Sequence, residues 1–325
     1  MNQFVRLALK SFLRELLAYH VIRHHSDGTQ PLFLYASRRG GSTALSEAIA
    51  AGLPTLYVDQ PFSVFTTPHY YFRNLVGRPY GPLTTECGLE SPLYDYIDGI
   101  INARLRPGIT INPRHTGFRL RTSRVLATIT DAQALAPWIS SKFDIRAIVL
   151  LRHPIPQARS VQRAGWPAVG AVFLRDVEYI NRHLTLEQLT VAREIYKAPQ
   201  KFEAFLLDWI LEHLPIFHSP CDPKQNLNLI YYEDMVENPQ RLLSSICPDM
   251  SPDGMNKALK SLSKASRSTQ FSTKERRNAL RQTDKKAIIS GWTNQIDSEN
   301  RKRAQALLTL FQIRHYSIDS AYPER

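Results

Sequence analysis

The chain has 325 residues and a net charge of +12, from 41 Lys and Arg against 29 Asp and Glu. Its apolar fraction of 43% and charged fraction of 22% are those of an ordinary globular protein. No apolar run is long enough to span a bilayer. Three widely spaced cysteines argue against a disulfide framework and predict a reducing, cytoplasmic setting, and no CxxC or HExxH spacing supports a zinc site.

The basic residues are unevenly distributed along the chain. Residues 264–286 hold eight Lys and Arg against two acids, and a second, acid-free cluster comprises Arg114, Arg119, Arg121 and Arg124. A basic protein can bind nucleic acid, an anionic surface or a polyanionic small molecule, although most charge runs are simply solvated. Because the aromatic residues are not interleaved with basic ones as a nucleic-acid platform requires, we expect no nucleic-acid partner.

Residues 3–25 predict the first helix. Their apolar positions recur near helical spacing, with Arg6, Lys10 and Arg14 between them. We therefore expect residues 1–30 to form an amphipathic helix that packs on the domain. A targeting peptide is the alternative, since the stretch is basic and poor in acids, but it has no uninterrupted apolar centre and no small-residue cleavage site.

Residues 31–50 predict a strand, a phosphate-binding loop and a helix. The apolar run 32–35 is followed by the loop Ser37-Arg38-Arg39-Gly40-Gly41-Ser42-Thr43 and by a helix-forming run that ends at Gly52. The glycines let the backbone approach an anion, the helix start offers N–H groups and hydroxyls, and the arginines add positive charge. The first Gly and the Lys of the nucleoside-triphosphate pattern GxxxxGK(S/T) are absent. The loop therefore predicts a phosphate cradle of another type, with a plain turn as the alternative.

The next stretch predicts two strands, a long aromatic segment and a helix. Leu56–Val58 predicts a strand that ends at Asp59. Residues 62–100 are rich in aromatics and turn formers, and we interpret them either as loops and short helices that cover an acceptor site or as a helical cap with its own small core. The alternation in Thr116–Arg121 predicts a strand, and Ser123–Ser140 predicts a helix.

The second half of the chain alternates buried strands with helices. Ile145–Leu151 and Leu227–Tyr231 predict buried strands, residues 156–215 are mostly helical, and Ser298–Ile313 predicts a last helix. Strands that alternate with helices give a parallel sheet covered on both faces. We predict an α/β fold, a three-layer sandwich with a central parallel sheet of about five strands, P-loop-like and with helical insertions, in one domain over residues 31–325.

Two further elements carry chemistry. Arg152 follows the buried strand 145–151, and Ser160 comes eight residues later, in the following helix. An Arg at the carboxyl end of a parallel strand stands where ligands bind, and with a Ser hydroxyl it can hold one phosphate. The other element is Tyr232-Glu233-Asp234, directly after the strand 227–231. Taken singly, Arg152 could form a surface ion pair, Ser160 could be an ordinary helix residue and Tyr232 could be a core aromatic.

The loop, the Arg–Ser pair and the Tyr segment, in this order, resemble the sulfotransferase superfamily that uses 3'-phosphoadenosine 5'-phosphosulfate (PAPS), in a bacterial-type form. The resemblance covers residues 31–313. It implies that the loop binds the 5'-phosphosulfate, that the Arg–Ser pair and a late basic loop bind the 3'-phosphate, and that the Tyr lies by the adenine. The implied PAPS-binding residues are Arg38, Arg39, Gly40, Gly41, Ser42, Thr43, Arg152, Ser160, Tyr232, Arg267, Arg276 and Arg277.

The general base departs from the family pattern. The cytosolic branch carries a catalytic His near the end of a central strand, but the corresponding Leu120-Arg121-Thr122-Ser123 has none. Another branch, which includes bacterial enzymes, uses a Glu after the second strand, where this chain has Asp59 shifted by one residue. The resemblance thus implies Asp59 as base, with His69 and His115 as further candidates and a structural role equally open for Asp59. It also implies Arg39 as the catalytic residue that stabilises the transferred group.

The predicted activity is in-line transfer of a sulfuryl group from PAPS, the co-substrate, to a hydroxyl or less often an amine. The acceptor is a small molecule, a lipid or a carbohydrate; the scheme requires no metal, and peripheral membrane contact stays open. The sequence does not give the oligomeric state. One alternative is a small-molecule kinase on a related P-loop fold, which the missing Lys disfavours. The other is a non-catalytic nucleotide- or RNA-binding protein, driven by the basic stretches.

Overall fold

The computed structural model describes the chain over residues 3–63, 90–109, 111, 115–116, 118–219, 227–264, 277–279, 282 and 284–324. Its strands are β1 (Arg23–His24), β2 (Leu32–Tyr35), β3 (Thr55–Asp59), β4 (Arg121–Thr122), β5 (Arg124–Ile129), β6 (Arg146–Leu151) and β7 (Leu227–Tyr231). Its helices are α1 (Gln3–Val21), α2 (Ser42–Gly52), α3 (Glu90–Ile101), α4 (Ala136–Lys142), α5 (Pro154–Arg163), α6 (Val177–His183), α7 (Leu186–Ile195), α8 (Phe202–Phe217), α9 (Tyr232–Glu237), α10 (Pro239–Ile246), α11 (Pro252–Leu262), α13 (Lys285–Ser290) and α14 (Ser298–Leu310). Short 3-10 helices lie at η1 (Gln133–Leu135) and η2 (Gly170–Arg175).

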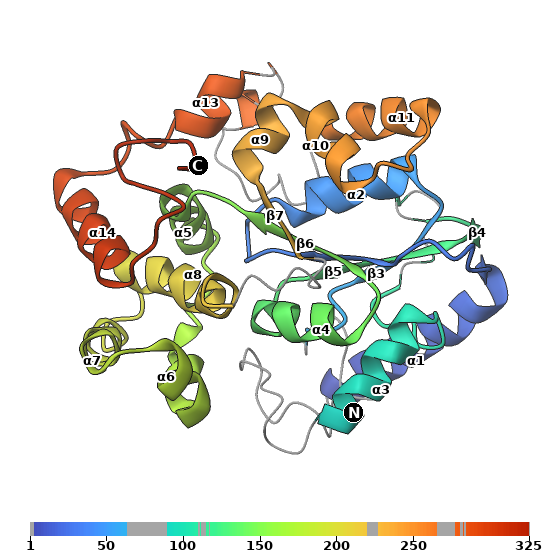
Figure 1. Ribbon diagram of the computed structural model, residues 1–325, viewed down its shortest axis with the longest axis horizontal. Coiled ribbons are helices and arrows are strands. Elements are labelled where there is room, and N and C mark those ends of the chain that lie inside the picture. Colours follow the sequence, from blue (N-terminus) through green and yellow to red (C-terminus); the bar gives the residue numbers. More distant parts are fainter. Residues whose placement is uncertain are drawn as a thin grey trace.

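Within the described residues, the centre of the molecule is a five-stranded parallel sheet with the strand order β3-β5-β2-β6-β7 (Figure 1). The central strand β2 pairs with β5 on one side and with β6 on the other, so that Leu34 lies level with Thr128 and Ile148. Since the strands are parallel, their carboxyl ends share one edge, where ligands bind in open α/β sheets. The predicted fold class is confirmed.

The side chains of β2 alternate between two helical layers. Leu32 and Leu34 pack in one cluster with residues of α2, α9, α10 and α11, whereas Phe33 and Tyr35 belong to the cluster to which α3, α4, α8 and α14 contribute. Figure 1 shows α2, α9, α10 and α11 above the sheet and α3, α4 and α8 below it. Because both faces are covered, the central strands are continuous apolar runs.

Most of the predicted elements are confirmed. The strands expected at 32–35, 56–58, 145–151 and 227–231 are β2, β3, β6 and β7. The helix expected after the phosphate loop is α2, and the mostly helical region 156–215 holds α5 to α8. The last helix is α14, whose N-cap Asp297 accepts a hydrogen bond from the backbone N–H of Asn300.

The prediction for residues 116–140 is wrong in its element types up to residue 129, and only the end of the expected helix is helical, in η1 and α4. Arg124–Ile129 forms the strand β5, not a helix, and within the described residues of 116–121 only Arg121 is in a strand. All six residues of β5 are buried, because it lies between β3 and β2. A strand buried on both faces shows no alternation, so its periodicity does not separate it from a buried helix.

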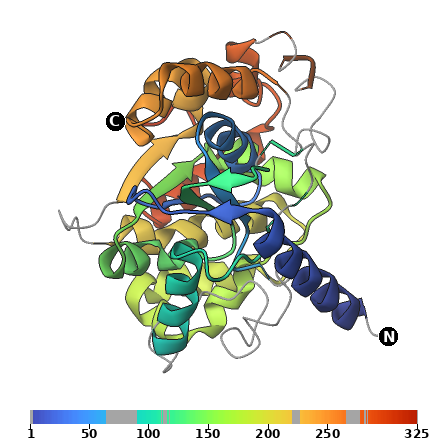
Figure 2. The ribbon, with the colours of Figure 1, turned by 90° about the vertical axis from the view of Figure 1, so that its right-hand side faces the viewer.

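The helix α1 stands apart from the layers. Figure 2 shows it extending from the body of the molecule, with its N-terminal end pointing away. It is followed by β1, which pairs with β4 in a separate two-stranded sheet. In the described part of the chain, no helix combines the length and apolar character needed to cross a membrane.

Candidate functional site

The phosphate loop predicted from the sequence connects β2 to α2 at the carboxyl edge of the sheet. The N–H of Gly40 donates to the carbonyl of Ser37 at 2.9 Å, which closes a tight turn. Arg39 and Gly41 both adopt left-handed backbone angles, with φ of 64° and 106°. Such a φ is unfavourable for a side chain such as that of Arg39, and strain of this kind is concentrated at ligand-binding loops.

The start of α2 is suited to an anion. Its N-cap is Gly41, and no side chain caps the helix. The first backbone N–H groups of a helix have no partner within the helix, and together with the helix dipole they attract a phosphate or sulfate. Ser42 and Thr43 begin the helix at this point. The geometry of the loop is therefore compatible with the predicted anion cradle, which stays a prediction.

The glycines at positions 40 and 41 are also required because a side chain would not fit there. A Cβ atom added at Gly41 would lie 2.6 Å from the ring of Tyr232, at the start of α9. At Gly40, it would lie 2.8 Å from the carbonyl oxygen of Ser37. Both distances are far below van der Waals contact, so a side chain at either position would force the loop away from Tyr232 or open the turn.

Arg152 and Ser160 meet the loop from β6 and α5. The Arg152 guanidinium Nη1 donates to the backbone carbonyl of Arg39 at 2.8 Å. The Arg39 Nε donates to the hydroxyl oxygen of Ser160 at 3.1 Å. Arg152 and Ser160 are 6% and 7% exposed, so both are held in the edge of the molecule rather than on an open surface. The eight-residue spacing thus brings both side chains to the same loop.

Tyr232 completes this group from the other side of β6. The Arg152 guanidinium lies over its ring, 4.8 Å from the centroid, a stabilising cation–π arrangement. The neighbouring Glu233 accepts hydrogen bonds from the backbone N–H of His153 at 3.1 Å and from the Tyr316 hydroxyl at 2.8 Å. These bonds tie the end of β6 to the start of α9 and fix Tyr232 against Arg152.

Gln157 is a supporting residue that the sequence analysis did not identify. It is buried on α5, one turn before Ser160, and its Nε2 donates to the carbonyl of Arg38 at 2.9 Å. Arg152 and Gln157 therefore hold two successive carbonyls of the loop. The signal for Gln157 was its position three residues before Ser160, which puts both on one face of the helix.

The Arg38 side chain points elsewhere. Its guanidinium pairs with the buried Asp208 carboxylate on α8 at 3.1 Å and donates to the carbonyl of Pro167 at 3.0 Å. Asp208 also accepts from the N–H groups of Val169 and Gly170, at 2.8 and 2.7 Å. Arg38 thus contacts Asp208, behind the loop, through its side chain, and its backbone carbonyl accepts from Gln157.

A chain of buried polar groups lies behind the loop. Burial raises the pKa of Glu212 to about 8, and its hydrogen bond with Ser37 and the Arg38 charge act in the opposite direction. The Ser37 Oγ lies 3.3 Å from His213 Nε2, and the other ring nitrogen of His213 lies 2.7 Å from the carbonyl of Trp209. Burial lowers the pKa of His213 to about 4, so this imidazole is neutral and its Nδ1–H donates to the carbonyl.

The two described candidate bases lie on the other side of the site, around Tyr57. Asp59 is half-buried at the carboxyl end of β3, where its Oδ1 accepts from the Tyr57 hydroxyl at 3.2 Å. The ring of His115 stacks on Tyr57 with centroids 5.7 Å apart. Gly108 packs against the Asp59 carbonyl: at its φ of 67°, an added Cβ would lie 2.0 Å from that oxygen.

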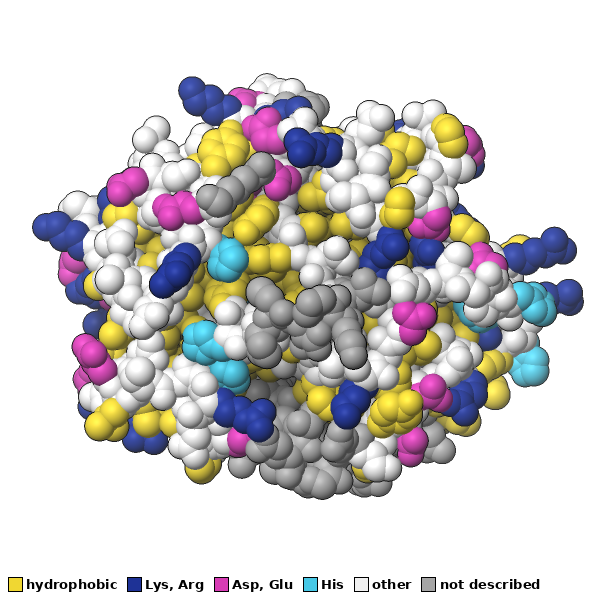
Figure 3. Space-filling view, in the orientation of Figure 1, with side chains coloured by type: hydrophobic (Ala, Val, Ile, Leu, Met, Phe, Trp, Pro, Cys, Tyr) yellow, Lys and Arg dark blue, Asp and Glu magenta, His cyan; other side chains and the backbone are white. Residues whose placement is uncertain are grey.

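Most of the late basic loop predicted from the sequence lies outside the described residues. Arg267 and Arg276 lie outside the described residues, and Arg277 is exposed. Most of the aromatic segment that we expected over an acceptor site, residues 64–89 with the candidate base His69, is also outside them. On the face shown in Figure 3, the described Lys and Arg side chains are scattered among acidic ones and form no continuous basic patch. The described residues contain no cluster of three His, Cys, Asp or Glu placed to hold a metal.

The site therefore has two parts. The donor half comprises Arg39, Arg152, Ser160 and Tyr232, which form one contact network at the ends of β2, β6 and β7. The acceptor half comprises Tyr57, Asp59 and His115 at the end of β3. Chemically, the donor half offers an Arg-rich anion site beside an aromatic ring, and the acceptor half offers groups able to accept a proton.

Three solved structures with a similar chain path are compared with this chain below by TM-score, sequence identity and the share of each chain that is covered. Mouse sulfotransferase SULT7A1 complexed with PAP has a TM-score of 0.43 and 15% identity, over 94% of this chain and 92% of that chain. Retinol dehydratase, in complex with androsterone and the inactive cofactor PAP, has a TM-score of 0.39 and 13% identity, over 93% of this chain and 86% of that chain. The sulfotransferase domain from the Synechococcus PCC 7002 olefin synthase has a TM-score of 0.38 and 18% identity, over 89% of this chain and 96% of that chain.

Sequence comparisons add no relative. No protein-family model matches the chain, and no curated protein sequence matches it. Two of the three solved structures are sulfotransferases by name, which is the class that the sequence motifs resemble. At these TM-scores and identities the similarity is distant, so the functional proposal rests on the chain's own residues.

Proposed function

We propose that this protein is a sulfotransferase that moves a sulfuryl group from PAPS to an acceptor hydroxyl. One observation carries the proposal. Arg39, Arg152, Ser160 and Tyr232, which come from three separate motifs, are joined by two hydrogen bonds and a cation–π contact at one edge of the sheet. A plain turn, an ordinary helix residue and a core aromatic have no reason to meet in this way.

The donor half has a group for each part of the nucleotide. The uncapped start of α2 and Arg39 suit the 5'-phosphosulfate, which carries negative charge on both sides of the bond to be broken. Arg152 and Ser160 suit the 3'-phosphate, with a guanidinium and a hydroxyl on one anion. Tyr232, whose ring is largely covered by Arg152, would border the adenine with the small part of its ring that stays exposed. Arg277 is the described candidate from the late basic loop.

In the proposed reaction, the acceptor oxygen bonds to sulfur as the bond between sulfur and the 5'-phosphate oxygen breaks. The acceptor proton passes to Asp59, or to His115 as the second candidate, and 3'-phosphoadenosine 5'-phosphate leaves. Arg39 and the N–H groups at the start of α2 stabilise the charge that grows on the leaving phosphate and on the sulfuryl oxygens. As in phosphoryl transfer, most of the catalysis is positioning and charge stabilisation.

The proposal favours a sulfotransferase over a kinase because of the Arg152–Ser160 pair. A kinase for ATP needs a Lys on the β- and γ-phosphates and has no use for a 3'-phosphate site. An RNA-binding protein would use aromatic rings spaced along a basic surface. In this chain the Tyr232 ring is instead largely buried and packed on Arg152.

The test is calorimetric binding of 3'-phosphoadenosine 5'-phosphate beside adenosine 5'-phosphate, which lacks the 3'-phosphate. We expect a dissociation constant of about a micromolar for the first and binding at least about tenfold weaker for the second. Equal binding of both nucleotides, or tight binding of ATP without any preference for the 3'-phosphate, would contradict the proposal. RNA binding with a steep salt dependence and no binding of either nucleotide would favour the RNA-binding alternative.

The same measurement on Arg152→Ala assigns the 3'-phosphate site. Loss of a charge-assisted contact should weaken binding of 3'-phosphoadenosine 5'-phosphate by about 10- to 100-fold and leave adenosine 5'-phosphate unchanged. Arg146→Ala is the matched control, since Arg146 lies at the opposite end of β6 and donates to the carbonyl of Ile246. Normal affinity in Arg152→Ala would remove this residue from the site.

A further inference from the structure

The part of helix α1 whose side chains are described presents several apolar residues to solvent. Among those side chains, the buried ones are Glu15 and Ala18, with Ile22 just beyond the end of the helix. On the other side, Leu9, Phe12, Leu13, Leu16 and Leu17 are 46–51% exposed. A surface helix of a globular protein normally has the reverse arrangement, with its apolar stripe against the core.

Arg106 fixes this orientation. The carboxylate of Glu15 accepts the backbone N–H of Arg106 at 2.7 Å. The buried Arg106 guanidinium donates to the carbonyls of Ala18 and Ile22, at 3.0 and 2.9 Å, and lies 4.3 Å from the ring centroid of Tyr19. Because the contacts come from one side of the helix end, α1 cannot roll its leucines inward without breaking a buried polar cluster.

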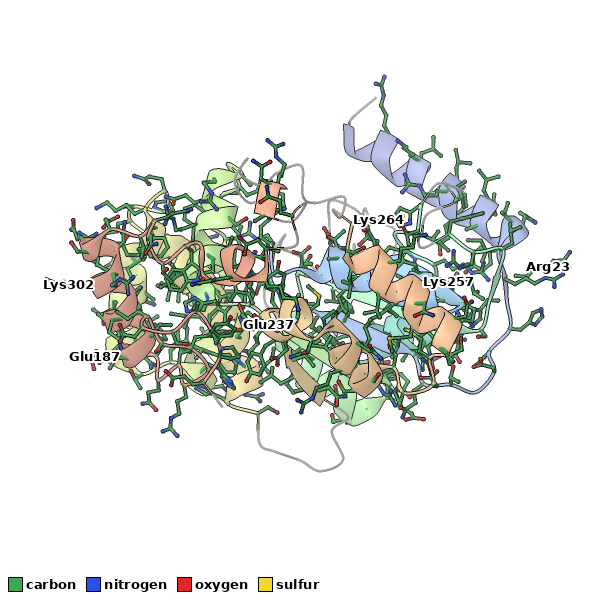
Figure 4. All side chains as sticks on the ribbon, turned by 90° about the horizontal axis from the view of Figure 1, so that it is seen from above. Arg23, Glu187, Glu237, Lys257, Lys264 and Lys302 are labelled. Carbon is green, nitrogen blue, oxygen red and sulfur yellow. The ribbon has the colours of Figure 1, made fainter. Side chains whose placement is uncertain are left out.

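The outward face has a basic edge. At about 100° per residue, the five exposed apolar side chains span one arc of the helix, and three basic residues lie along one side of it. Arg6 falls within that side of the arc, Lys10 lies at its edge and Arg14 lies beyond it, and none of the three is buried. The one acid of the helix, Glu15, is on the inward side. Figures 2 and 4 show that α1 projects from the body in both views, which leaves this face accessible.

We propose that this face of α1 binds an anionic lipid surface, with the leucines and Phe12 in the acyl boundary and the basic edge on the headgroups. An apolar arc bordered by Lys and Arg is the pattern of helices that lie in a membrane interface. A second copy packed through the same face would cover the leucines but would bring only more basic residues, because Glu15, the one acid of α1, is buried on the inward side. Anionic headgroups satisfy both parts of the face. The inference goes beyond the proposed sulfuryl transfer and does not depend on it.

The experiment is flotation of the full chain with vesicles of phosphatidylcholine alone or mixed with phosphatidylserine. We expect binding to the mixed vesicles at least about tenfold tighter than to the neutral ones, and weaker binding at high salt. The double variant Leu13→Glu/Leu17→Glu should abolish binding, and Lys10→Glu should remove most of the preference for phosphatidylserine. All three positions are exposed, so the fold tolerates these changes.

The matched control places the same charges on other exposed apolar residues. Val177 and Leu186 are 70% and 80% exposed on α6 and α7, and Val177→Glu/Leu186→Glu should bind vesicles like the parent chain. No binding of the parent to mixed vesicles would overturn the proposal. So would a dimer in sedimentation that Leu13→Glu/Leu17→Glu dissociates while vesicle binding is unchanged, because the face would then be a contact between copies.

Discussion

The donor and acceptor halves of the candidate site differ in how they are built. In the donor half, Arg39 is held by Ser160 and its carbonyl by Arg152, so each group is tied to another element. In the acceptor half, Asp59 accepts from Tyr57, two residues before it on the same strand, and the Tyr57 hydroxyl lies 3.2 Å from the Ser46 hydroxyl on α2. The described contacts of the donor half therefore join the ends of three strands, whereas those of the acceptor half gather around Tyr57 on one strand.

Under the proposed function, this difference matches what each half would bind. The donor would be the same nucleotide whatever the acceptor, so its groups gain from a rigid, buried arrangement that is complete before the nucleotide arrives. An acceptor site is shaped by connecting segments, which vary in sequence and carry specificity. The comparison predicts that changes in the acceptor half alter turnover alone, while changes in the donor half divide between turnover and nucleotide binding.

The largest effect is expected for Asp59→Asn in the acceptor half. Loss of a general base should lower kcat by about 10²- to 10⁴-fold, with no change in the affinity for 3'-phosphoadenosine 5'-phosphate. The measurement is transfer of labelled sulfate from PAPS in a panel of phenols, sugars and hydroxylated lipids, beside calorimetry with the product nucleotide. Tyr57→Phe removes the hydrogen bond that orients the carboxylate and should cost about fivefold.

His115→Gln separates the two candidate bases. If His115→Gln lost turnover while Asp59→Asn kept it, Asp59 would have a structural role and His115 would be the base. A parallel loss of nucleotide affinity in Asp59→Asn would contradict the division of the site into two halves.

The next effect is expected for Arg39→Gly in the donor half. Glycine accepts the φ of 64° at this position without strain, so the variant removes the guanidinium and leaves the loop in place. We expect kcat to fall by about 10²- to 10³-fold, as for loss of a group that stabilises developing charge, and nucleotide affinity to fall by less than about tenfold. Arg193→Ala, at an exposed position on α7, is the control for loss of one positive charge. A larger loss of affinity than of turnover would make Arg39 a binding residue only.

The same contrast explains what the sequence predicted. The donor half was predictable because each motif directly follows a short, mostly apolar strand, and parallel strands bring their carboxyl ends together. Gly41 and Tyr232 are far apart in the sequence, but each motif could be identified on its own from the strand that precedes it. The mutual contacts, such as the Arg152 bond to the Arg39 carbonyl, depend on strand order, which local patterns do not give.

The acceptor half was less predictable for a physical reason. The acceptor half lies at the end of β3, and β3 is joined to the rest of the sheet through β5, which was predicted to be a helix. Local preference favoured a helix because Ala residues continue past the strand toward α4, but burial on both faces of the sheet determined the outcome. Likewise, the exposure of the α1 leucines depends on the contact of Glu15 with Arg106, a residue far along the chain.

The smallest effect concerns stability and involves Glu212, behind the donor half. Burial favours the protonated form of Glu212, and the nearby Asp208 charge acts in the same direction, whereas the Arg38 charge and the hydrogen bond with Ser37 favour the ionised form. The Ser37 hydroxyl also lies 3.3 Å from His213 Nε2, whose other ring nitrogen donates to the carbonyl of Trp209. Arg38, Asp208 and Asp131 provide the surrounding charges.

Stability should therefore fall as the pH rises above neutrality, and Glu212→Gln should remove much of this dependence. The folded protein holds the Glu212 proton up to a pKa of about 8, whereas the ordinary value is 4.5, so the folded state binds more protons between these values and loses stability with rising pH. His213 has the opposite effect between its folded pKa of about 4 and its ordinary 6.5, so the window that isolates Glu212 lies above pH 6.5.

Between about pH 6.5 and 8, the Glu212 contribution to the free energy of unfolding should fall by about 2 kcal/mol, and urea denaturation at several pH values measures it. The Gln amide can still hydrogen-bond with Ser37 and is neutral at every pH, so the stability of the variant relative to the parent should grow by about 2 kcal/mol from pH 6.5 to 8. Asp253→Asn, at an exposed carboxylate on α11, should leave the slope unchanged. An identical slope in Glu212→Gln and the parent would show that Glu212 is ionised across this range. The loop would then rest on a charged support, and the donor half would lose the neutral, preorganised backing that distinguishes it here from the acceptor half.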